Sequence, residues 1–219
     1  MQTITINNLL PNVFKGMEES SQIRESRIWE NPSFNFHKGC RICIHAESGG
    51  GKSSLLSFIY GNRNDYQGKI LFDGENIRNL NISQWCDIRQ GTIALLPQEM
   101  RLFPELTAIE NIQLKNGLTN NKNQEEIDEM LNLLGILDKK HSPVGKMSIG
   151  QQQRVAIIRT LCQPFDFIFL DEPVSHLDEA NNKTVARLVE REANKNNSGI
   201  IATSVGNHLM LDKAEFINL

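Results

Sequence analysis

The sequence has no apolar run that approaches the roughly 20 residues a helix needs to cross a bilayer. It also has no excess of one charge, because 23 basic residues face 26 acidic ones, and it therefore offers no electrostatic footprint for nucleic acid. Residues 1–6 alternate in polarity like a strand and do not resemble a signal peptide. We therefore expect a cytoplasmic protein with no nucleic-acid partner and no direct membrane insertion.

Cysteine is also sparse, with four residues scattered along a chain of 219. Cys40 and Cys43 have a spacing found in metal sites, but no second pair accompanies them, and the apolar residues around Cys43 favour a buried thiol in a strand. A chain of this length can bury a full core, which fits one α/β domain with an inserted subdomain.

The glycine-rich segment Ala46–Ser54 lies between an apolar stretch and a segment of helical composition, an order typical of strand, glycine loop and helix. Consecutive glycines let backbone amides surround phosphate oxygens, while Lys52 brings a full positive charge to the β and γ phosphates and Ser53 offers its hydroxyl to Mg²⁺. A flexible linker would hardly lie between a strand and a helix. The predicted phosphate-binding residues are Ser48, Gly49, Gly50, Gly51, Lys52, Ser53 and Ser54.

Two adjacent acids, Asp171 and Glu172, close the apolar run 165–170. A buried parallel strand forms such a run, and ligands of open α/β sheets lie at the carboxyl ends of the strands. One acid can hold Mg²⁺ while the other orients a water for attack on a phosphoryl group. The alternative, two solvated acids at a strand end, is disfavoured by the glycine loop earlier in the chain.

Three further motifs accompany these two: the segment Ile93–Gln98 (IALLPQ), the stretch Arg101–Ile112 and the segment Met147–Gln151 (MSIGQ). In this order the motifs resemble those of the ATP-binding subunits of ATP-binding cassette (ABC) transporters, and the resemblance covers nearly the whole chain. It implies an α/β fold, with a P-loop NTPase (RecA-like) core, an antiparallel β subdomain and an inserted α-helical subdomain. The expected single ABC ATPase domain, 1–219, has its core at about 1–98 and 147–219 and the helical subdomain at about 99–146.

The resemblance also implies a role for each matching residue. Gln98 would contact Mg²⁺ and the attacking water, Asp171 would support the metal together with Ser53, and Glu172 would position or deprotonate the water. Ser148 and Gly150 would reach the γ-phosphate of ATP bound to a second copy, and Gln151 and Asp178 would belong to the same nucleotide site. The implied cofactors are ATP and Mg²⁺.

Three positions depart from the family pattern. Ala46 stands where the P-loop has its first glycine. Ile149 replaces a glycine of the signature; we expect the contact with ATP to survive this change, whereas the geometry of the dimer could shift. Ser204 takes the place of a histidine that reaches the γ-phosphate, and a hydroxyl carries no positive charge there. We hypothesise that His176, in a loop that crosses the dimer interface in the family, partly takes over that role; the alternative is an interface histidine without chemistry. His208 is interpreted as a surface histidine.

An aromatic residue after the first strand stacks on adenine in the family, and Phe14 is the candidate here, with Trp29 second and a plain core Phe14 as the alternative. Residues 3–14 and 27–44 are expected as strands around a polar hairpin loop at 15–22. Asp73-Gly74 is expected as the turn that completes the antiparallel part.

The helical insertion has its clearest element after Asn123, which is expected to cap a helix with Glu126. Apolar residues at helical spacing predict its core face: Ile127, Met130, Leu131, Leu134 and Leu137. Met100, Leu102 and Phe103 are candidates for a groove that receives a permease, or else for packing within the subdomain.

The resemblance implies a homodimer that forms on ATP binding, with a heterodimer left open, and an integral membrane permease that holds the protein at the inner face of the cell membrane. The run Gln151–Arg159, the stretch 102–111 and the polar insert resemble most the lipoprotein-releasing, macrolide-efflux and cell-division ATPase branch. An importer or ordinary exporter subunit is a second interpretation. A slow nucleotide-gated dimerisation or signalling module is a third, favoured by Ser204, whereas Glu172 favours the first two.

Overall fold

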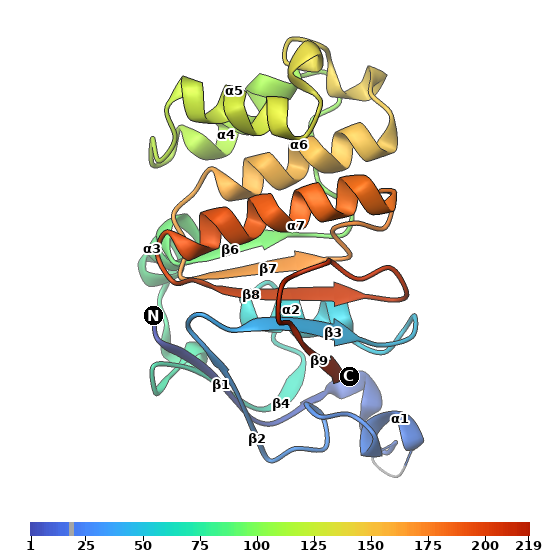
Figure 1. Cartoon of the computed structure of the whole chain (residues 1–219). Helices are drawn as coiled ribbons and strands as arrows, with labels where there is room; N and C mark the ends of the chain where they lie inside the picture. Colours follow the sequence, from blue (N-terminus) through green and yellow to red (C-terminus); the bar gives the residue numbers. More distant parts are fainter. Residues whose placement is uncertain (18–19) are drawn as a thin grey trace.

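The computed structural model describes residues 1–17 and 20–219 and shows two sheets with helices packed around them (Figure 1). The strands are β1 (Thr3–Pro11), β2 (Ser33–His37), β3 (Arg41–His45), β4 (Tyr66–Phe72), β5 (Glu75–Asn76), β6 (Ile93–Leu96), β7 (Phe167–Asp171), β8 (Gly199–Ser204) and β9 (Glu215–Asn218). The helices are α1 (Ser21–Arg24), α2 (Lys52–Ile59), α3 (Ile82–Gly91), α4 (Ala108–Asn116), α5 (Gln124–Leu133), α6 (Ile149–Leu161) and α7 (Glu179–Asn194), with 3₁₀ turns at Asn12–Phe14, Ile77–Asn79, Leu137–Lys139 and Val144–Lys146.

The antiparallel sheet has the strand order β2-β1-β4-β5. The alternation at the start of β1 buries Ile4 and Ile6, as a half-buried strand should. A β-bulge interrupts the β1–β4 pairing after Asn7, and Gly68 is required opposite it, since a Cβ there would lie 2.2 Å from the carbonyl oxygen of Asn8. The expected turn at Asp73-Gly74 joins β4 to β5 and is confirmed.

The expected strand over residues 27–44 is wrong in its first part. Residues 27–30 form a turn, and the strand begins only at Ser33. The hydroxyl of Ser26 accepts the backbone N–H groups of Ile28 (3.2 Å) and Trp29 (2.8 Å) and so competes with a strand ladder. The strand expected over 3–14 ends at Pro11, and the insert at 15–22 contains the start of α1, while its residues 18 and 19 lie outside the described chain.

The second sheet is parallel, with the order β6-β7-β8-β3-β9. Its strand β7 is buried throughout, and successive side chains face opposite sides. Phe167 and Phe169 pack with α2 and the antiparallel sheet, whereas Ile168 and Leu170 pack with α6, α7 and the helical insertion. Figure 1 shows α6 and α7 lying between the parallel sheet and the pair α4 and α5. The expected α/β architecture is therefore confirmed.

The helical insertion forms α4 and α5, each begun by a capping box. Asn123 and Glu126 form the second box as expected, and Ile127, Met130, Leu131 and Leu134 are buried. Leu137, expected in the same core, is instead 39% exposed, because α5 ends at Leu133 and the chain turns at Gly135 with a φ of 64°. The division into a core and a helical subdomain stays a prediction.

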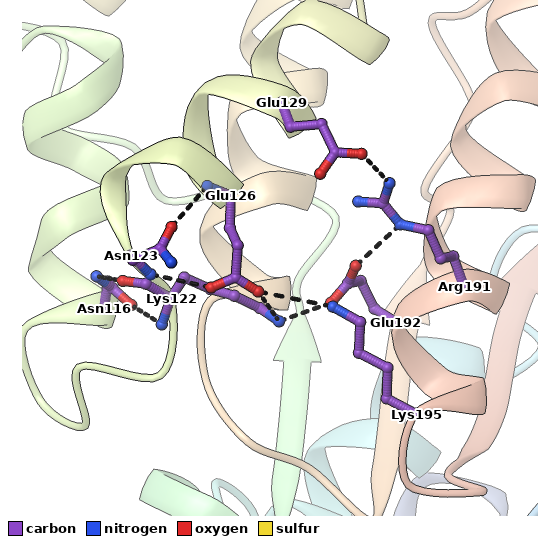
Figure 2. Close-up of polar contacts among 8 residues, drawn as sticks. All are labelled: Asn116, Lys122, Asn123, Glu126, Glu129, Arg191, Glu192 and Lys195. Carbon is purple, nitrogen blue, oxygen red and sulfur yellow. Dashed lines mark hydrogen bonds and ion pairs between the residues drawn. The ribbon is translucent and has the colours of Figure 1, made fainter.

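A cluster of ion pairs joins the insertion to α7 (Figure 2). The side chain of Glu192 is only 3% exposed and accepts from Lys122 at 2.7 Å, Lys195 at 2.8 Å and Arg191 at 3.1 Å. The side chain of Lys122 is 8% exposed, and its ammonium lies 3.6 Å from the carboxylate of Glu126. The insertion is therefore held to α7 by charge as well as by apolar packing.

Cys43 is buried and its thiol pKa is raised to about 11 by burial, as expected for a structural cysteine, while Cys40 is half-buried. In the part of the chain that the structure describes, no group of three or more His, Cys, Asp or Glu side chains is placed to hold a metal. Nor does any helix within residues 1–17 and 20–219 combine the length and the apolar character that crossing a membrane requires.

Candidate nucleotide site

The glycine loop runs between the end of β3 and the start of α2, as the sequence predicts. Gly49 and Gly51 have φ values of 85° and 93°, a region that residues with a Cβ rarely adopt. At Gly51 a Cβ would also lie 3.1 Å from the ring of Trp29 and 3.4 Å from that of Phe14. Glycine at this position lets the loop rest closely on two aromatic rings, with the N-terminus of α2 directly after it.

Lys52 is the first residue of α2 and is 5% exposed. Its ammonium donates to the carbonyl oxygens of Ala46 at 2.8 Å and Glu47 at 3.0 Å, which closes the loop on itself and leaves a third N–H for a ligand. Burial lowers the pKa of Lys52 below its ordinary value, although Glu172 and Asp171 act in the opposite direction. The two acids are thus close enough to the ammonium to influence its charge.

Asp171 and Glu172 lie at the carboxyl end of β7. The buried Asp171 carboxylate accepts the hydroxyl of Thr203 at 2.6 Å, and the same hydroxyl oxygen accepts the backbone N–H of Glu172 at 3.2 Å. Gln98, which follows β6, donates from Nε2 to the Glu172 carboxylate at 3.3 Å. The structure therefore brings together Gln98 and Glu172, to which the family resemblance assigns the same water.

One open pocket collects most of the predicted phosphate and catalytic residues. Its lining is Pro11, Val13, Phe14, Ser48, Gly49, Gly51, Lys52, Ser53, Ser54, Gln98 and Glu172. Gly50 instead lines a pocket on another side of the loop, and Asp171 is 5% exposed beneath the lining. One side of the pocket offers backbone amides, the Lys52 ammonium and hydroxyl groups, and the other side offers the Gln98 side-chain amide and the Glu172 carboxylate. Such a lining suits a polyphosphate with a water beside it.

The two aromatic candidates lie under the glycine loop. Phe14 is 7% and Trp29 5% exposed, their rings meet edge to face at 6.5 Å, and the Trp29 indole N–H donates to the carbonyl of Gly50 at 3.3 Å. Stacking of Phe14 on adenine stays a prediction, since the ring lines the pocket but is engaged in packing. Val13, which a search for aromatic residues misses, is 70% exposed at the same pocket.

The signature segment begins α6. Ser148 caps this helix in a capping box with Gln151, and Gly150 approaches the next loop so closely that a Cβ would lie 3.0 Å from the carbonyl oxygen of His176. Asp178 caps α7 by accepting the N–H of Asn181 at 2.8 Å. Ser148 and Gly150, assigned to the nucleotide of a second copy, are not among the residues lining the pocket of their own chain, and neither are the further nucleotide-binding candidates Gln151 and Asp178.

Ser204 ends β8 beside His45 and is 4% exposed. Its carbonyl accepts the N–H of Ala46 at 3.4 Å, but the residue is not part of the pocket lining, so contact with phosphate stays a prediction. His176 is exposed and its role likewise stays a prediction. His208 is exposed, as expected, and meets the ring of Phe216 edge to face.

Next to the site lies a second groove, lined by Tyr60, Asn62, Leu95, Pro97, Arg101, Phe103, Leu114, Lys115, Arg159 and Thr160. Phe103 is 53% exposed in this groove, so its contact with a permease stays a prediction. Met100 is buried and Leu102 packs against the core, which confirms the alternative of internal packing for these two residues. Burial lowers the pKa of both Lys115 and Arg159. Within the described residues Arg101, Lys115 and Arg159 form no ion pair with a carboxylate.

Comparison with known proteins identifies the family of the chain. The ABC transporter family model matches residues 29–175, more than half of the chain. The lipoprotein-releasing system ATP-binding protein LolD of Koribacter versatilis is 34% identical over 168 residues, 75% of each chain, and LolD 1 of Chlorobium chlorochromatii is 33% identical over 186 residues, 83% of this chain and 75% of its own. The trimethylamine N-oxide transport system ATP-binding protein TmoW of Pelagibacter ubique is 36% identical over 151 residues, 68% of this chain and 44% of its own.

Solved structures give the same answer. The ATP-binding cassette MJ0796, in a dimeric post-hydrolysis state bound to ADP and Pi, superposes with a TM-score of 0.69 at 25% identity, covering 80% of this chain and 78% of its own. A second dimeric structure of that cassette reaches a TM-score of 0.76 at 22% identity, covering 98% and 94%, and supports the fold. The chain therefore belongs to the ABC transporter family, as an ATP-binding cassette ATPase with the P-loop NTPase fold.

Proposed function

We propose that the chain is the ATP-hydrolysing subunit of a transporter whose membrane-spanning permease is a separate protein. The observation that carries this proposal is the single pocket in which the glycine loop faces Gln98 and Glu172. A site that only bound nucleotide would not need a carboxylate paired with an amide at the place where water must attack.

In this mechanism the loop amides and Lys52 hold the β and γ phosphates of ATP. The oxygens of Ser53, Gln98 and Asp171 are ligands of the kind that Mg²⁺ prefers, and Mg²⁺ bound there would neutralise charge on the phosphates. Glu172 orients a water and accepts its proton while the water oxygen bonds to the γ-phosphorus and the bond to ADP breaks. Positioning and charge stabilisation supply most of the rate in such a reaction.

A second copy completes the site. Ser148, Gly150, Gln151 and Asp178 lie at two helix N-termini outside the pocket of their own chain, and a helix N-terminus favours an anion. Two copies that face each other would place these residues against the ATP of the partner. The dimeric form of a 25% identical cassette bound to ADP and Pi supports this arrangement. A heterodimer with a related cassette is the alternative.

The groove around Phe103 is the proposed docking site of the permease. Its exposed aromatic ring offers apolar contact. Arg101, Lys115 and Arg159 have no carboxylate in an ion pair among the described residues, which favours a segment that carries an acidic side chain. Docking there would hold the protein at the cytoplasmic face of the membrane. The groove includes Pro97, which directly precedes Gln98 of the ATP site. A segment bound in the groove would therefore lie close to that site.

The relatives named for lipoprotein release favour a permease of that type over an importer, because two of them match three quarters of their own length or more. The TmoW relative, named for trimethylamine N-oxide transport, keeps the importer interpretation as the alternative. Ser204 favours a further candidate, a slow nucleotide-gated module, since loss of a charged γ-phosphate contact slows phosphoryl transfer by about 10²-fold or more when nothing replaces it.

Steady-state Mg-ATP hydrolysis by the wild type and by Ser204→His, with molecular mass measured in the presence of ATP, separates a working transport motor from a slow nucleotide-gated module. A working motor turns over as wild type and gains at most a few-fold from Ser204→His. A slow module forms a dimer with ATP, barely hydrolyses it, and gains about 10²-fold from the substitution.

A further inference from the structure

Gln153 lies in α6, five residues after the helix cap Ser148, and is 3% exposed. Every polar atom of its amide is used on the loop that follows β7. Nε2 donates to the carbonyl oxygen of Glu172 at 3.1 Å and to the hydroxyl of Ser175 at 3.3 Å, and Oε1 accepts the backbone N–H of His176 at 3.2 Å. One buried side chain thus ties the loop of residues 172–176 to the signature helix.

The backbone that Gln153 holds is an unfavourable one. Glu172 has a φ of 49°, in the left-handed region that residues with a Cβ rarely enter, and it precedes Pro173, which restricts it further. Such a conformation persists only when its surroundings over-determine it. Here the Thr203 hydroxyl accepts the Glu172 N–H at 3.2 Å, while Gln153 and the Ser175 hydroxyl, at 3.2 Å, donate to the Glu172 carbonyl.

We infer that Gln153 is a positioning residue for hydrolysis, which acts by fixing the backbone of Glu172 so that its carboxylate meets Gln98 at the pocket. The inference rests on the proposed role of Glu172. It has a mechanical consequence, because Ser148 caps the same helix that carries Gln153. A nucleotide of the second copy that binds at Ser148 acts through α6 on the direction of Glu172, so that closure of one site sets the geometry of the other.

The test compares Gln153→Glu with Gln152→Glu. The first change keeps the shape and the acceptor for the His176 N–H but removes both donors. The second makes the same chemical change at the next position, where the amide donates only to the carbonyl of Met147 at 3.0 Å. We expect Gln153→Glu to lower kcat by about 10- to 100-fold, the range expected for a misplaced catalytic group, with KM and the Kd for ATP changed by less than about threefold. Gln152→Glu should match the wild type.

Gln153→Met, which is uncharged and of similar length, carries the same expectation where a buried carboxylate prevents folding. In a Glu172→Gln background, Gln153→Glu should cause no further loss of hydrolysis, because the carboxylate it positions is already gone. A further loss there, or an equal rise in KM and fall in kcat, would show a merely structural role and overturn the inference. If Glu172→Gln alone retains turnover, the proposed function is overturned. If Glu172→Gln loses turnover while the Gln153 variants keep the wild-type kcat, only this inference is overturned.

Discussion

Replacing Glu192 by glutamine should destabilise the protein more than loss of any exposed ion pair. The substitution keeps the shape of the side chain but leaves the buried ammonium of Lys122, only 8% exposed, without its partner at 2.7 Å (Figure 2). Breaking a buried pair costs about 3–5 kcal/mol. Lys195 and Arg191 are 46% and 38% exposed and can turn to water, and Glu126 remains near Lys122, so we expect the lower value of about 2–4 kcal/mol.

Urea unfolding measures this free energy, and a thermal scan should show the melting temperature falling by roughly 4–16 °C, at 2–4 °C for each kcal/mol in a chain of this size. The control is Glu179→Gln, which breaks an exposed pair with Lys183 on α7 at 2.5 Å. Both partners of that pair are more than half exposed, so water screens their attraction and the loss should be much smaller than that of Glu192→Gln. Equal losses in the two variants would show that the Glu192 cluster does not stabilise the junction with the insertion.

The same cluster predicts that the free energy of unfolding depends on pH. Burial alone would raise the pKa of Glu192, but hydrogen bonds from Lys122 and Lys195 outweigh it and hold the pKa below the ordinary value of 4.5. The unfolded state therefore binds the proton first as the pH falls, and the stabilisation is present above pH 4.5 and lost as the pH drops through the lower native pKa. The difference in unfolding free energy between the wild type and Glu192→Gln should be constant near neutral pH and shrink below pH 4.5.

Two further predictions concern the nucleotide pocket. Val13→Tyr places a ring at the exposed mouth of the pocket, and because stacking on a base contributes about 1–3 kcal/mol, the Kd for ATP in a nucleotide titration should fall by about fivefold or more; an unchanged Kd would remove Val13 from the adenine site. Gly51→Ala forces a Cβ into the left-handed region and against Trp29, and should weaken ATP binding by about tenfold or more. The control is Gly74→Ala, because Gly74 also has a positive φ, of 90°, but has open space around it. Gly74→Ala should lower the free energy of unfolding by about 1–2 kcal/mol without changing the Kd for ATP. Equal effects of both glycine variants on ATP affinity would contradict the role given to the loop.

Local patterns in the sequence predict the parts of this structure that depend on near neighbours. The alternation in β1 reports which face is buried, because the side-chain period of a strand is two. The capping box at Asn123 needs only residues three positions apart. The glycine loop and the acids at the end of β7 were placed correctly at strand ends because parallel strands direct their carboxyl ends to one edge of the sheet.

What the sequence did not predict depends on contacts between distant segments. The three bonds of Gln153 reach residues about 20 positions later in the chain, and a run of three glutamines gives no sign of which one turns inward. Glu192 meets Lys122 across 70 positions. Residues 28 and 29 failed as a strand because a single hydroxyl, that of Ser26, offered their amides a local partner.

Hydrolysis by Glu172→Gln, measured beside the wild type and Glu99→Gln, tests the central claim most directly. Glu99 is an exposed carboxylate one position from Gln98, so its substitution removes the same charge beside the site without touching the proposed catalytic pair. We expect Glu172→Gln to bind ATP with the wild-type Kd and to lose at least about 10²-fold in kcat, the size expected for a general base, while Glu99→Gln hydrolyses ATP normally. Hydrolysis by Glu172→Gln at the wild-type rate would contradict the assignment of this carboxylate and the mechanism built on it.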